Sequence, residues 1–294
     1  MAVLTHDQKS AFWHDGYISV ENVIEPHLLA ALQSDFNNWV EESRKHMKPW
    51  GETADGRPRF DVEPTHSAKK PALRRVNSPV EVSQSYFKAM SDSKMTDIAA
   101  CLIGPNVKYH HSKINSKLPG TATVVKWHQD FPFTPHSNDD IVTALLFVDE
   151  VTAENGPLEV VAGTHKGDIH SLWHGGKFTA AVSDAVAADA QKKAVRCLGP
   201  AGGACFMHTR LLHGSAPNLS QEPRTLFITV YTAEDAVPYA PNPVPSRYEG
   251  LVVRGEKTNR VRSEAYEIEL PQKPAGAYFF VQQAEAEKPA QYNF

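Results

Sequence analysis

The feature that most constrains the fold is a change of pattern near residue 106. Beyond that point, short runs rich in β-branched and aromatic residues are separated by glycine, proline and asparagine. Several short strands at this spacing are typical of a sandwich or a barrel. The sequence therefore predicts a β-core. The runs cover residues 123–127, 141–148, 158–161, 203–207 and 224–231.

The residues before this core have a helical pattern, with capping residues and apolar residues that recur near a period of 3.6. Residues 45–75 are polar and irregular, which is typical of a long loop that is either a functional lid or disordered. The expected helix boundaries are Thr5 to Gly16, a start at Pro26, a start at Ser78-Pro79 and an end at Gly104-Pro105.

No clear linker interrupts the chain, so we expect one domain of helices packed around a β-core. Its helical N-terminal part spans about residues 1–105, its β-core about 106–235 and its C-terminal extension about 236–294. An alanine-rich stretch at residues 183–194 predicts a helix inserted among the strands, and residues 278–282 have a strand-like pattern.

Composition and charge exclude several classes of function. The net charge is −4 and no basic block dominates, so we expect no nucleic-acid partner. The longest apolar runs are too short for a transmembrane helix, and the N-terminus lacks a secretory signal pattern. The three cysteines include no C-x-x-C pair, which favours a reducing compartment and a cytoplasmic location. The oligomeric state stays open.

A histidine and an aspartate follow one of the predicted strands. His128 and Asp130 are two positions apart, so in an extended backbone both side chains point to the same face and can bind one metal ion. Two histidines and one carboxylate on one face of the ion suit non-haem iron(II). Alone, the motif is a weak signal, because the 14 histidines and 34 acidic residues predict roughly one or two such matches by chance.

A second segment strengthens the interpretation. His213 ends one predicted strand, a turn follows, and Arg224 begins the next apolar strand. An antiparallel pair of these strands would bring the Arg224 side chain back near His213. A guanidinium in an enclosed pocket needs an anion, and its geometry matches a carboxylate. A co-substrate that chelates iron at one end and carries a carboxylate at the other would fit both features.

These segments resemble the phytanoyl-CoA dioxygenase family of iron/2-oxoglutarate oxygenases. The family pattern is H-x-D, then a distal histidine, a serine two residues later and an arginine eleven residues after that histidine. Residues 155–165 resemble the family's NGPL…PGSH hairpin, and the opening F..DGY..V is also typical. The likeness extends to about residue 232. The pattern is matched by His128, Asp130, His213, Ser215 and Arg224.

The resemblance implies a mainly β fold with flanking helices, built on a double-stranded β-helix, the jelly-roll core also found in cupins. It implies that Fe(II), 2-oxoglutarate and O2 take part in the reaction. It also implies that Arg224 and Ser215 bind the distal carboxylate of 2-oxoglutarate. Related halogenases replace the metal-binding carboxylate with a small residue, so Asp130 favours hydroxylation of an aliphatic C–H bond, with release of succinate and CO2.

One segment is similar to part of the ectoine hydroxylases within this family. Their QSRIN segment corresponds to His111-Ser112-Lys113-Ile114-Asn115, and the resemblance implies that Asn115 contacts 2-oxoglutarate. His111 replaces the family glutamine. We therefore expect a different small metabolite or natural-product intermediate as substrate, and no acyl-CoA signature is visible. The candidate substrate contacts are His111, Phe131 and Phe133.

Other functions are consistent with parts of the sequence. The same iron chemistry could give desaturation or cyclisation instead of hydroxylation. A cupin-like hydrolase or isomerase with zinc or manganese would share the β-core, but it has no use for the carboxylate clamp at Arg224. A non-catalytic relative that binds a ligand would not need the intact set of metal ligands.

Overall fold

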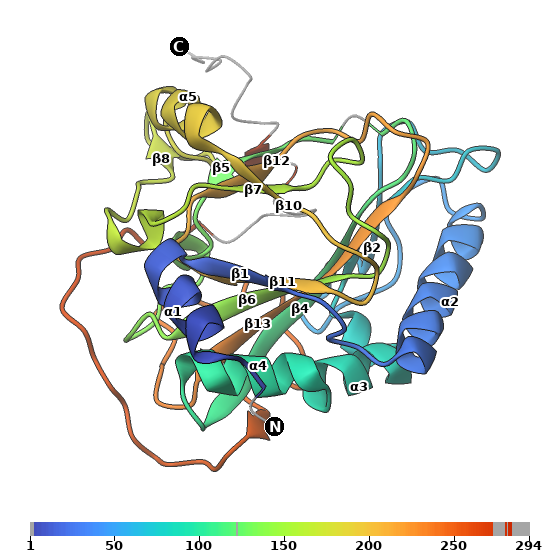
Figure 1. The fold of residues 1–294 in the computed structure, drawn as a ribbon. Helices are drawn as coiled ribbons and strands as arrows, with labels where there is room; N and C mark the ends of the chain where they lie inside the picture. Colours follow the sequence, from blue (N-terminus) through green and yellow to red (C-terminus); the bar gives the residue numbers. More distant parts are fainter. Residues whose placement is uncertain (1–2, 122, 273–279, 281, 284–294) are drawn as a thin grey trace.

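Two antiparallel sheets form the centre of the computed structural model, which describes residues 3–121, 123–272, 280 and 282–283 (Figure 1). The larger sheet has the order β1 (Tyr17–Val20), β11 (Ala204–His208), β6 (Ile141–Phe147), β13 (Arg224–Ala233), β4 (Val107–Lys117), β3 (Leu73–Asn77) and β2 (Phe60–Val62), and β14 (Val252–Arg254) pairs with β4. The smaller sheet has the order β10 (Val195–Cys197), β7 (Leu158–Val160), β12 (His213–Ser215) and β5 (Val125–His128). A separate hairpin joins β8 (Trp173–His174) to β9 (Lys177–Phe178).

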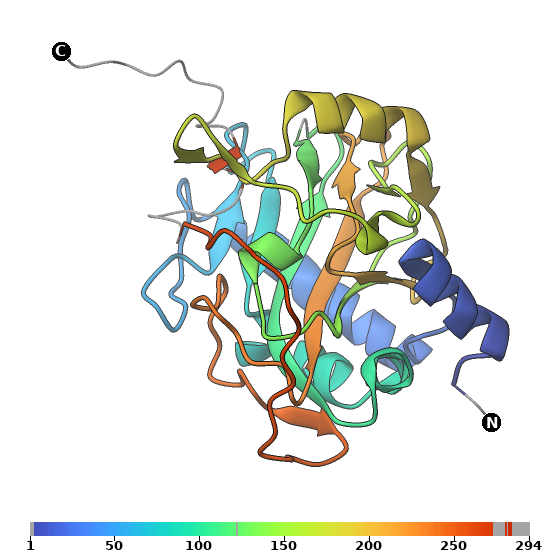
Figure 2. The ribbon, with the colours of Figure 1, turned by 90° about the vertical axis from the view of Figure 1, so that its left-hand side faces the viewer.

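Helices cover the face of the larger sheet that points away from the smaller one (Figure 1). The helix α4 packs against β4, β6 and β13, and α5 packs near β5 of the smaller sheet. Figure 2 shows α4 and α5 on opposite sides of the β-core. No helix in the described part of the chain has both the length and the apolar character needed to cross a bilayer. The helices are α1 (His6–Asp15), α2 (Pro26–Ser43), α3 (Gln84–Ser91), α4 (Lys94–Ile103) and α5 (Asp184–Lys193).

Alternation along β13 divides its side chains between two apolar clusters. Phe227 and Tyr231 belong to the large cluster under the helices, whereas Leu226 and Ile228 belong to a cluster between the two sheets. Successive side chains of a strand point to opposite faces, so Arg224 shares the face of Leu226 and Ile228. The first residue of this strand therefore points into the space between the sheets.

The structure confirms the expected jelly-roll core with flanking helices and most of the helix boundaries. Thr5 caps α1 through a reciprocal pair of hydrogen bonds with Gln8, and Gly16 ends the helix with a φ of 85°. Pro26 begins α2, Gly104 follows α4, and the alanine-rich stretch forms α5.

The N-terminal region contains three strands where the sequence predicted helix or, for residues 45–75, a long loop. The strands β1, β2 and β3 lie before residue 106, and all three join the larger sheet. Their partners lie elsewhere along the chain: Tyr17 pairs with Met207, for example. Ser78-Pro79 begins only a short 3-10 turn, Pro79–Glu81, and α3 starts later at Gln84, with Ser83 as its cap.

The expected strand at residues 278–282 lies mostly outside the described residues. The two residues of it that the structure describes, Phe280 and Gln282, have helical backbone.

Candidate functional site

His128 is the last residue of β5, Asp130 follows it just before the 3-10 turn Phe131–Phe133, and His213 lies across from His128 on the neighbouring strand β12. His128 and His213 are Cα partners in this antiparallel pair. Their ring centroids are 4.1 Å apart. The Oδ1 atom of Asp130 is 3.7 Å from the Nε2 atom of each histidine. Among the described residues, this is the only group of three such side chains close enough to share one metal ion.

Hydrogen bonds orient both rings toward Asp130. The Nδ1 atom of each histidine lies near the carbonyl oxygen of the residue two positions earlier, at 2.7 Å for His128 and 2.9 Å for His213. A ring that donates its proton from Nδ1 carries its lone pair on Nε2. The Oδ2 atom of Asp130 accepts a hydrogen bond from Thr143 at 2.8 Å, so that Oδ1 is the atom nearest the two rings.

Burial keeps both imidazoles neutral, as a metal ligand requires. Burial, together with the neighbouring His213, lowers the pKa of His128 to about 3. Burial also lowers the pKa of His213. Two neutral imidazoles and one carboxylate form the ligand set that suits non-haem Fe(II) with open coordination positions. The side chains present therefore fit an iron site.

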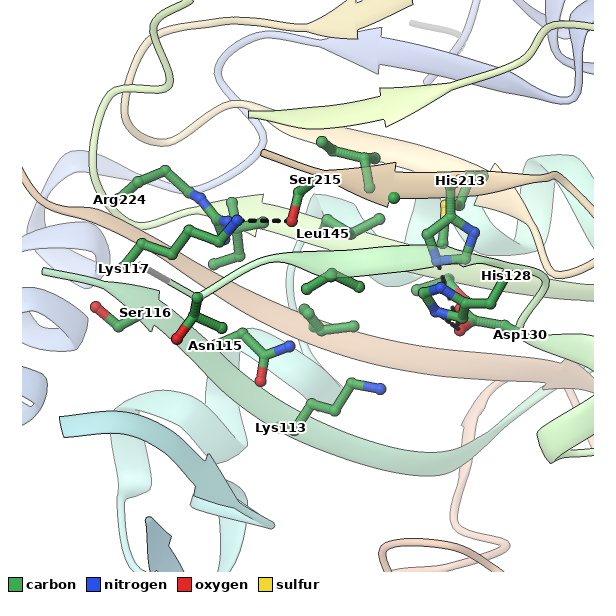
Figure 3. A pocket seen from close by; sticks show the side chains of 18 of the residues that line it. Lys113, Asn115, Ser116, Lys117, His128, Asp130, Leu145, His213, Ser215 and Arg224 are labelled. Carbon is green, nitrogen blue, oxygen red and sulfur yellow. Dashed lines mark hydrogen bonds and ion pairs between the residues drawn. The ribbon is translucent and has the colours of Figure 1, made fainter. Parts of the chain in front are cut away.

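A pocket extends from these three residues toward Arg224 and Ser215 (Figure 3), with about 640 Å³ of space not filled by atoms, part of it continuous with solvent. The guanidinium of Arg224 is buried and donates from Nε to the carbonyl oxygen of Gly156 at 2.9 Å. The Nζ atom of Lys117 donates to Oγ of Ser215 at 2.7 Å and also to the carbonyl oxygen of Ala216. Two basic side chains and a hydroxyl therefore meet at the end of the pocket that is distant from the histidines.

Position 156 must be glycine, because its backbone lies close to the neighbouring turn. Its φ is +80°, and a Cβ atom at this position would lie 2.7 Å from the carbonyl oxygen of Ala216. A larger residue would push apart the backbone that positions both Arg224 and Lys117. Asn155 stabilises the same turn by donating to the carbonyl oxygen of Glu150 at 2.8 Å.

The positive charge at this end of the pocket calls for an anion. Burial lowers the pKa of Arg224 to about 10, and burial together with the charge of Arg224 lowers the pKa of Lys117 to about 6. Asp130, at the opposite end, is the only carboxylate among the described residues that line the pocket. Buried cations are stabilised by a carboxylate in contact with them. A dicarboxylate that spans the pocket, such as 2-oxoglutarate, matches this distribution of charge.

We expect Lys117 to take up a proton when 2-oxoglutarate binds. Its pKa of about 6 leaves the amine mostly neutral at pH 7.5, and an incoming carboxylate raises that pKa. Affinity should then fall by up to about tenfold per pH unit as the pH rises above 6, until it passes the pKa of the bound state. Calorimetry of anaerobic Fe(II)-loaded protein in buffers of different ionisation enthalpy measures the uptake.

The matched control for this prediction is Lys117→Arg, which stays charged throughout this pH range. The variant should show no proton uptake at this site. An equal uptake in Lys117→Arg and in the wild-type protein would contradict the prediction.

Arg224 reaches the pocket by a route that differs from our sequence prediction. We expected His213 and Arg224 on two paired strands, and this was wrong. The strand β12 pairs with β5 and β7, whereas β13 pairs with β4 and β6. The two residues belong to opposite sheets, and strand alternation points Arg224 into the space between them.

The remaining predicted residues are found in three different environments. Asn115 lines the pocket between its two ends, and its buried Oδ1 has no hydrogen-bond partner among the described residues. His111 and Phe133 line a second cavity that also reaches His128. Phe131, expected as a pocket wall, is fully buried against Ile141 instead. Phe131 and Phe133 lie in one 3-10 turn, and their rings point in different directions.

Sequence reasoning missed three of the basic residues that line the two cavities: Lys113, Lys117 and Arg57. Lys113 and Lys117 lie on β4 at alternate positions with Asn115, and all three line the first pocket. That alternation is a signal that could have identified them, because the side chains of one strand face are two residues apart. Arg57 lines the second cavity together with Arg75, and both lie within residues 45–75, which we expected to be a long loop.

Comparison with known families gives a match over most of the chain. The family model described as Phytanoyl-CoA dioxygenase (PhyH) matches residues 12–226. A protein of Stutzerimonas stutzeri described as a probable alpha-ketoglutarate-dependent hypophosphite dioxygenase is 30% identical over 269 residues, which cover 90% of each chain. The human peroxisomal phytanoyl-CoA dioxygenase is 27% identical over 233 residues, which cover 74% of this chain and 65% of the human protein.

Solved structures share the fold. The structure of EctD from S. alaskensis in its apo form has a TM-score of 0.69 and 23% sequence identity, and the match covers 87% of this chain and 88% of EctD. Another structure of EctD, solved with 2-oxoglutarate and 5-hydroxyectoine, has a TM-score of 0.60. These matches show the same jelly-roll architecture.

Proposed function

Because this chain belongs to the phytanoyl-CoA dioxygenase family and is an iron(II)- and 2-oxoglutarate-dependent oxygenase, we propose that it hydroxylates an aliphatic C–H bond of a small metabolite or natural-product intermediate. The observation that carries the proposal is one pocket with His128, Asp130 and His213 at one end and Arg224 and Lys117 at the other. One atom of O2 enters the product as a hydroxyl group, the other enters succinate, and CO2 leaves. A cytoplasmic location stays a prediction from the cysteine pattern.

The proposal assigns a role to each side chain of the pocket. His128 and His213 hold iron through Nε2, and Asp130 holds it through Oδ1. Bound iron supplies the activation of O2 that is coupled to decarboxylation of 2-oxoglutarate. Arg224 and Ser215 bind the distal carboxylate of 2-oxoglutarate. This role accounts for a buried guanidinium in the pocket, which packing alone does not explain.

Two further side chains complete the co-substrate pocket. Lys117 shares the distal carboxylate with Arg224, because its ammonium contacts Ser215 in the same corner. Asn115 contacts the middle of the co-substrate from β4, through an amide whose Oδ1 is buried without a partner among the described residues. The apolar residues Leu145 and Leu226 line the pocket between the charged ends and exclude water there.

The test is an incubation of Fe(II)-loaded protein with 2-oxoglutarate, a panel of small metabolites and 18O2. We expect succinate that carries one labelled oxygen, formed slowly without a substrate and faster with one that fits. The product should carry the second labelled oxygen. A product without labelled oxygen would indicate desaturation or cyclisation. Turnover without O2, with zinc or manganese, would support a hydrolase or isomerase, and failure to bind Fe(II) and 2-oxoglutarate would support a non-catalytic binding protein.

A second candidate function is oxidation of a small phosphorus oxyanion. It is favoured by the 30% identity over 90% of each chain to a probable hypophosphite dioxygenase. In that reaction one oxygen atom enters a P–H bond of hypophosphite and gives phosphite, and the same co-substrate gives succinate and CO2. The same incubation with hypophosphite, followed by phosphorus NMR, distinguishes the two candidates by the appearance of phosphite.

A further inference from the structure

A second cavity shares Lys113, His128 and Asp130 with the co-substrate pocket, and all its other described lining residues are different. It has about 540 Å³ of space not filled by atoms, part of it continuous with solvent. Because it reaches two of the same metal ligands through a separate set of lining residues, a molecule in it would have access to the iron position without displacing 2-oxoglutarate. This makes it the place for the substrate.

The lining of this cavity is rich in cations. Arg57, Arg75 and Lys113 all contribute to it, whereas Asp130 is the only carboxylate among its described lining residues. The charge of Asp130 is committed to the metal in the proposed function. His111 adds a fourth basic group, although burial lowers its pKa well below the usual value and keeps it neutral.

Hydrogen bonds to neighbouring residues hold the two arginines in place. Arg57 donates from Nε to Asp55 at 2.8 Å and from Nη2 to the carbonyl oxygen of Pro243 at 2.6 Å. Arg75 donates from Nε to Oδ1 of Asn77 at 2.8 Å. These bonds orient the guanidinium groups before any ligand arrives, and a preorganised cation loses little entropy on binding.

Lys113 differs from the arginines because its ammonium has no hydrogen bond or ion pair with another residue that the structure describes. It extends from β4 toward the end of the pocket that holds His128 and Asp130 (Figure 3). Burial and the charge of Arg75 lower its pKa to about 8, whereas Asp130 acts in the opposite direction. An ammonium in this position is stabilised by an anion that enters the cavity.

The rest of the lining is apolar. Phe133, Val230 and Val244 form walls on the same cavity, and the ring of Phe133 meets the ring of His128 edge-on at 5.7 Å. A short hydrocarbon chain can pack against these walls, while a charged group reaches the three cations. Such a molecule would present its aliphatic part near the metal ligands.

We propose that this cavity binds a small organic anion, with an oxyanion group held by Lys113, Arg75 and Arg57 and a short aliphatic part against Phe133. This assignment rests on the proposed function, because it names the substrate class of that same site. A carboxylate and a phosphonate both have the required chemistry, and the experiment separates them.

The experiment measures binding to anaerobic protein loaded with Fe(II) and 2-oxoglutarate, with butyrate, propylphosphonate and uncharged butyramide as calorimetric probes. We expect at least one anion to bind about 10- to 100-fold more tightly than butyramide, as a charge-assisted contact predicts. The ratio of the Kd for propylphosphonate to the Kd for butyrate shows which oxyanion the site prefers. In Lys113→Met the ratio of the Kd for butyramide to the Kd for the preferred anion should fall by at least about tenfold, measured at a 2-oxoglutarate concentration that saturates the variant.

The matched control is Lys108→Met on the same strand, whose ammonium donates to the carbonyl oxygens of Glu234 and Ala236 and does not line the cavity. Lys108→Met should keep the wild-type preference for the anion over butyramide. Retention of the Fe(II)–2-oxoglutarate absorption band shows that a variant is folded, and Arg75→Met replaces Lys113→Met if the latter loses the band. The inference is overturned if butyramide binds as tightly as both anions, if no anion binds, or if the variant keeps the wild-type preference.

Failure of the proposed function would look different. In that case the wild-type protein would form no Fe(II)–2-oxoglutarate band, before any anion is added. If the band forms and the anions show no preference, only the assignment of the substrate class fails.

Discussion

Substitution of His213 by alanine should abolish the Fe(II)–2-oxoglutarate complex and leave no measurable succinate release. The three ligand atoms lie within 4.8 Å of one another, and each metal bond depends on that geometry. Substitution of a residue that only supports a metal ligand commonly lowers metal affinity by about 10- to 100-fold, so loss of a ligand should cost at least about 100-fold. The measurement is an anaerobic titration of the protein with Fe(II) and 2-oxoglutarate, followed by the visible charge-transfer band of the chelate.

A suitable control for this prediction is His14→Ala. His14 lies on α1, its side chain is 82% exposed, and its ring contacts Asp15 at 2.7 Å. The variant should form the band at the wild-type concentrations of Fe(II) and 2-oxoglutarate. Should His213→Ala also form it at those concentrations, His213 is not a ligand, and the metal must be held by another set of residues.

The metal ligands could be predicted from sequence to different degrees. The prediction that His128 and Asp130 point to one face of an extended strand was right about their proximity and wrong about the backbone. The strand β5 ends at His128, and Asp130 has αR backbone just before the 3-10 turn Phe131–Phe133, although its Oδ1 atom still lies 3.7 Å from Nε2 of His128. His213 is far along the chain, and only its spacing to Ser215 and Arg224 in the family pattern connected it with them. The structure explains why that spacing matters, because β12 pairs with β5 and places His213 opposite His128.

Long-range pairing limited the rest of the prediction. Tyr17–Val20 is too short to be recognised as a strand without its partner β11, and the same holds for β2. Lys117 was missed because a lysine in a strand is ordinarily solvated, and only the antiparallel register of Arg224 with Lys117 brings the two basic side chains together. Phe131 was assigned to the pocket from its position beside Asp130, but the direction of a side chain in a 3-10 turn depends on the packing around it.

Substitution of Arg224 by methionine should raise the Kd for 2-oxoglutarate by roughly 100- to 1,000-fold, with Fe(II) binding unchanged. A guanidinium whose pKa is lowered only to about 10 is fully charged at neutral pH. Loss of two charge-assisted hydrogen bonds to a carboxylate in a buried pocket accounts for that range. The measurement is the same anaerobic titration with variable 2-oxoglutarate. Arg196→Met is the control, because its half-exposed side chain binds Glu159 instead; a Kd equal to that of the control would contradict the assignment.

The number of protons that Arg224→Met takes up when it binds 2-oxoglutarate independently tests whether Arg224 and Lys117 bind the same carboxylate. The charge of Arg224 contributes, after burial, to the lowered pKa of Lys117. Its removal should raise that pKa, so more Lys117 is already protonated at pH 7.5 and fewer protons are taken up when 2-oxoglutarate binds. The pH dependence of the Kd above pH 6 should therefore be weaker in Arg224→Met than in the wild-type protein. Unchanged proton uptake in a variant with a raised Kd would mean that the two cations act on the co-substrate separately.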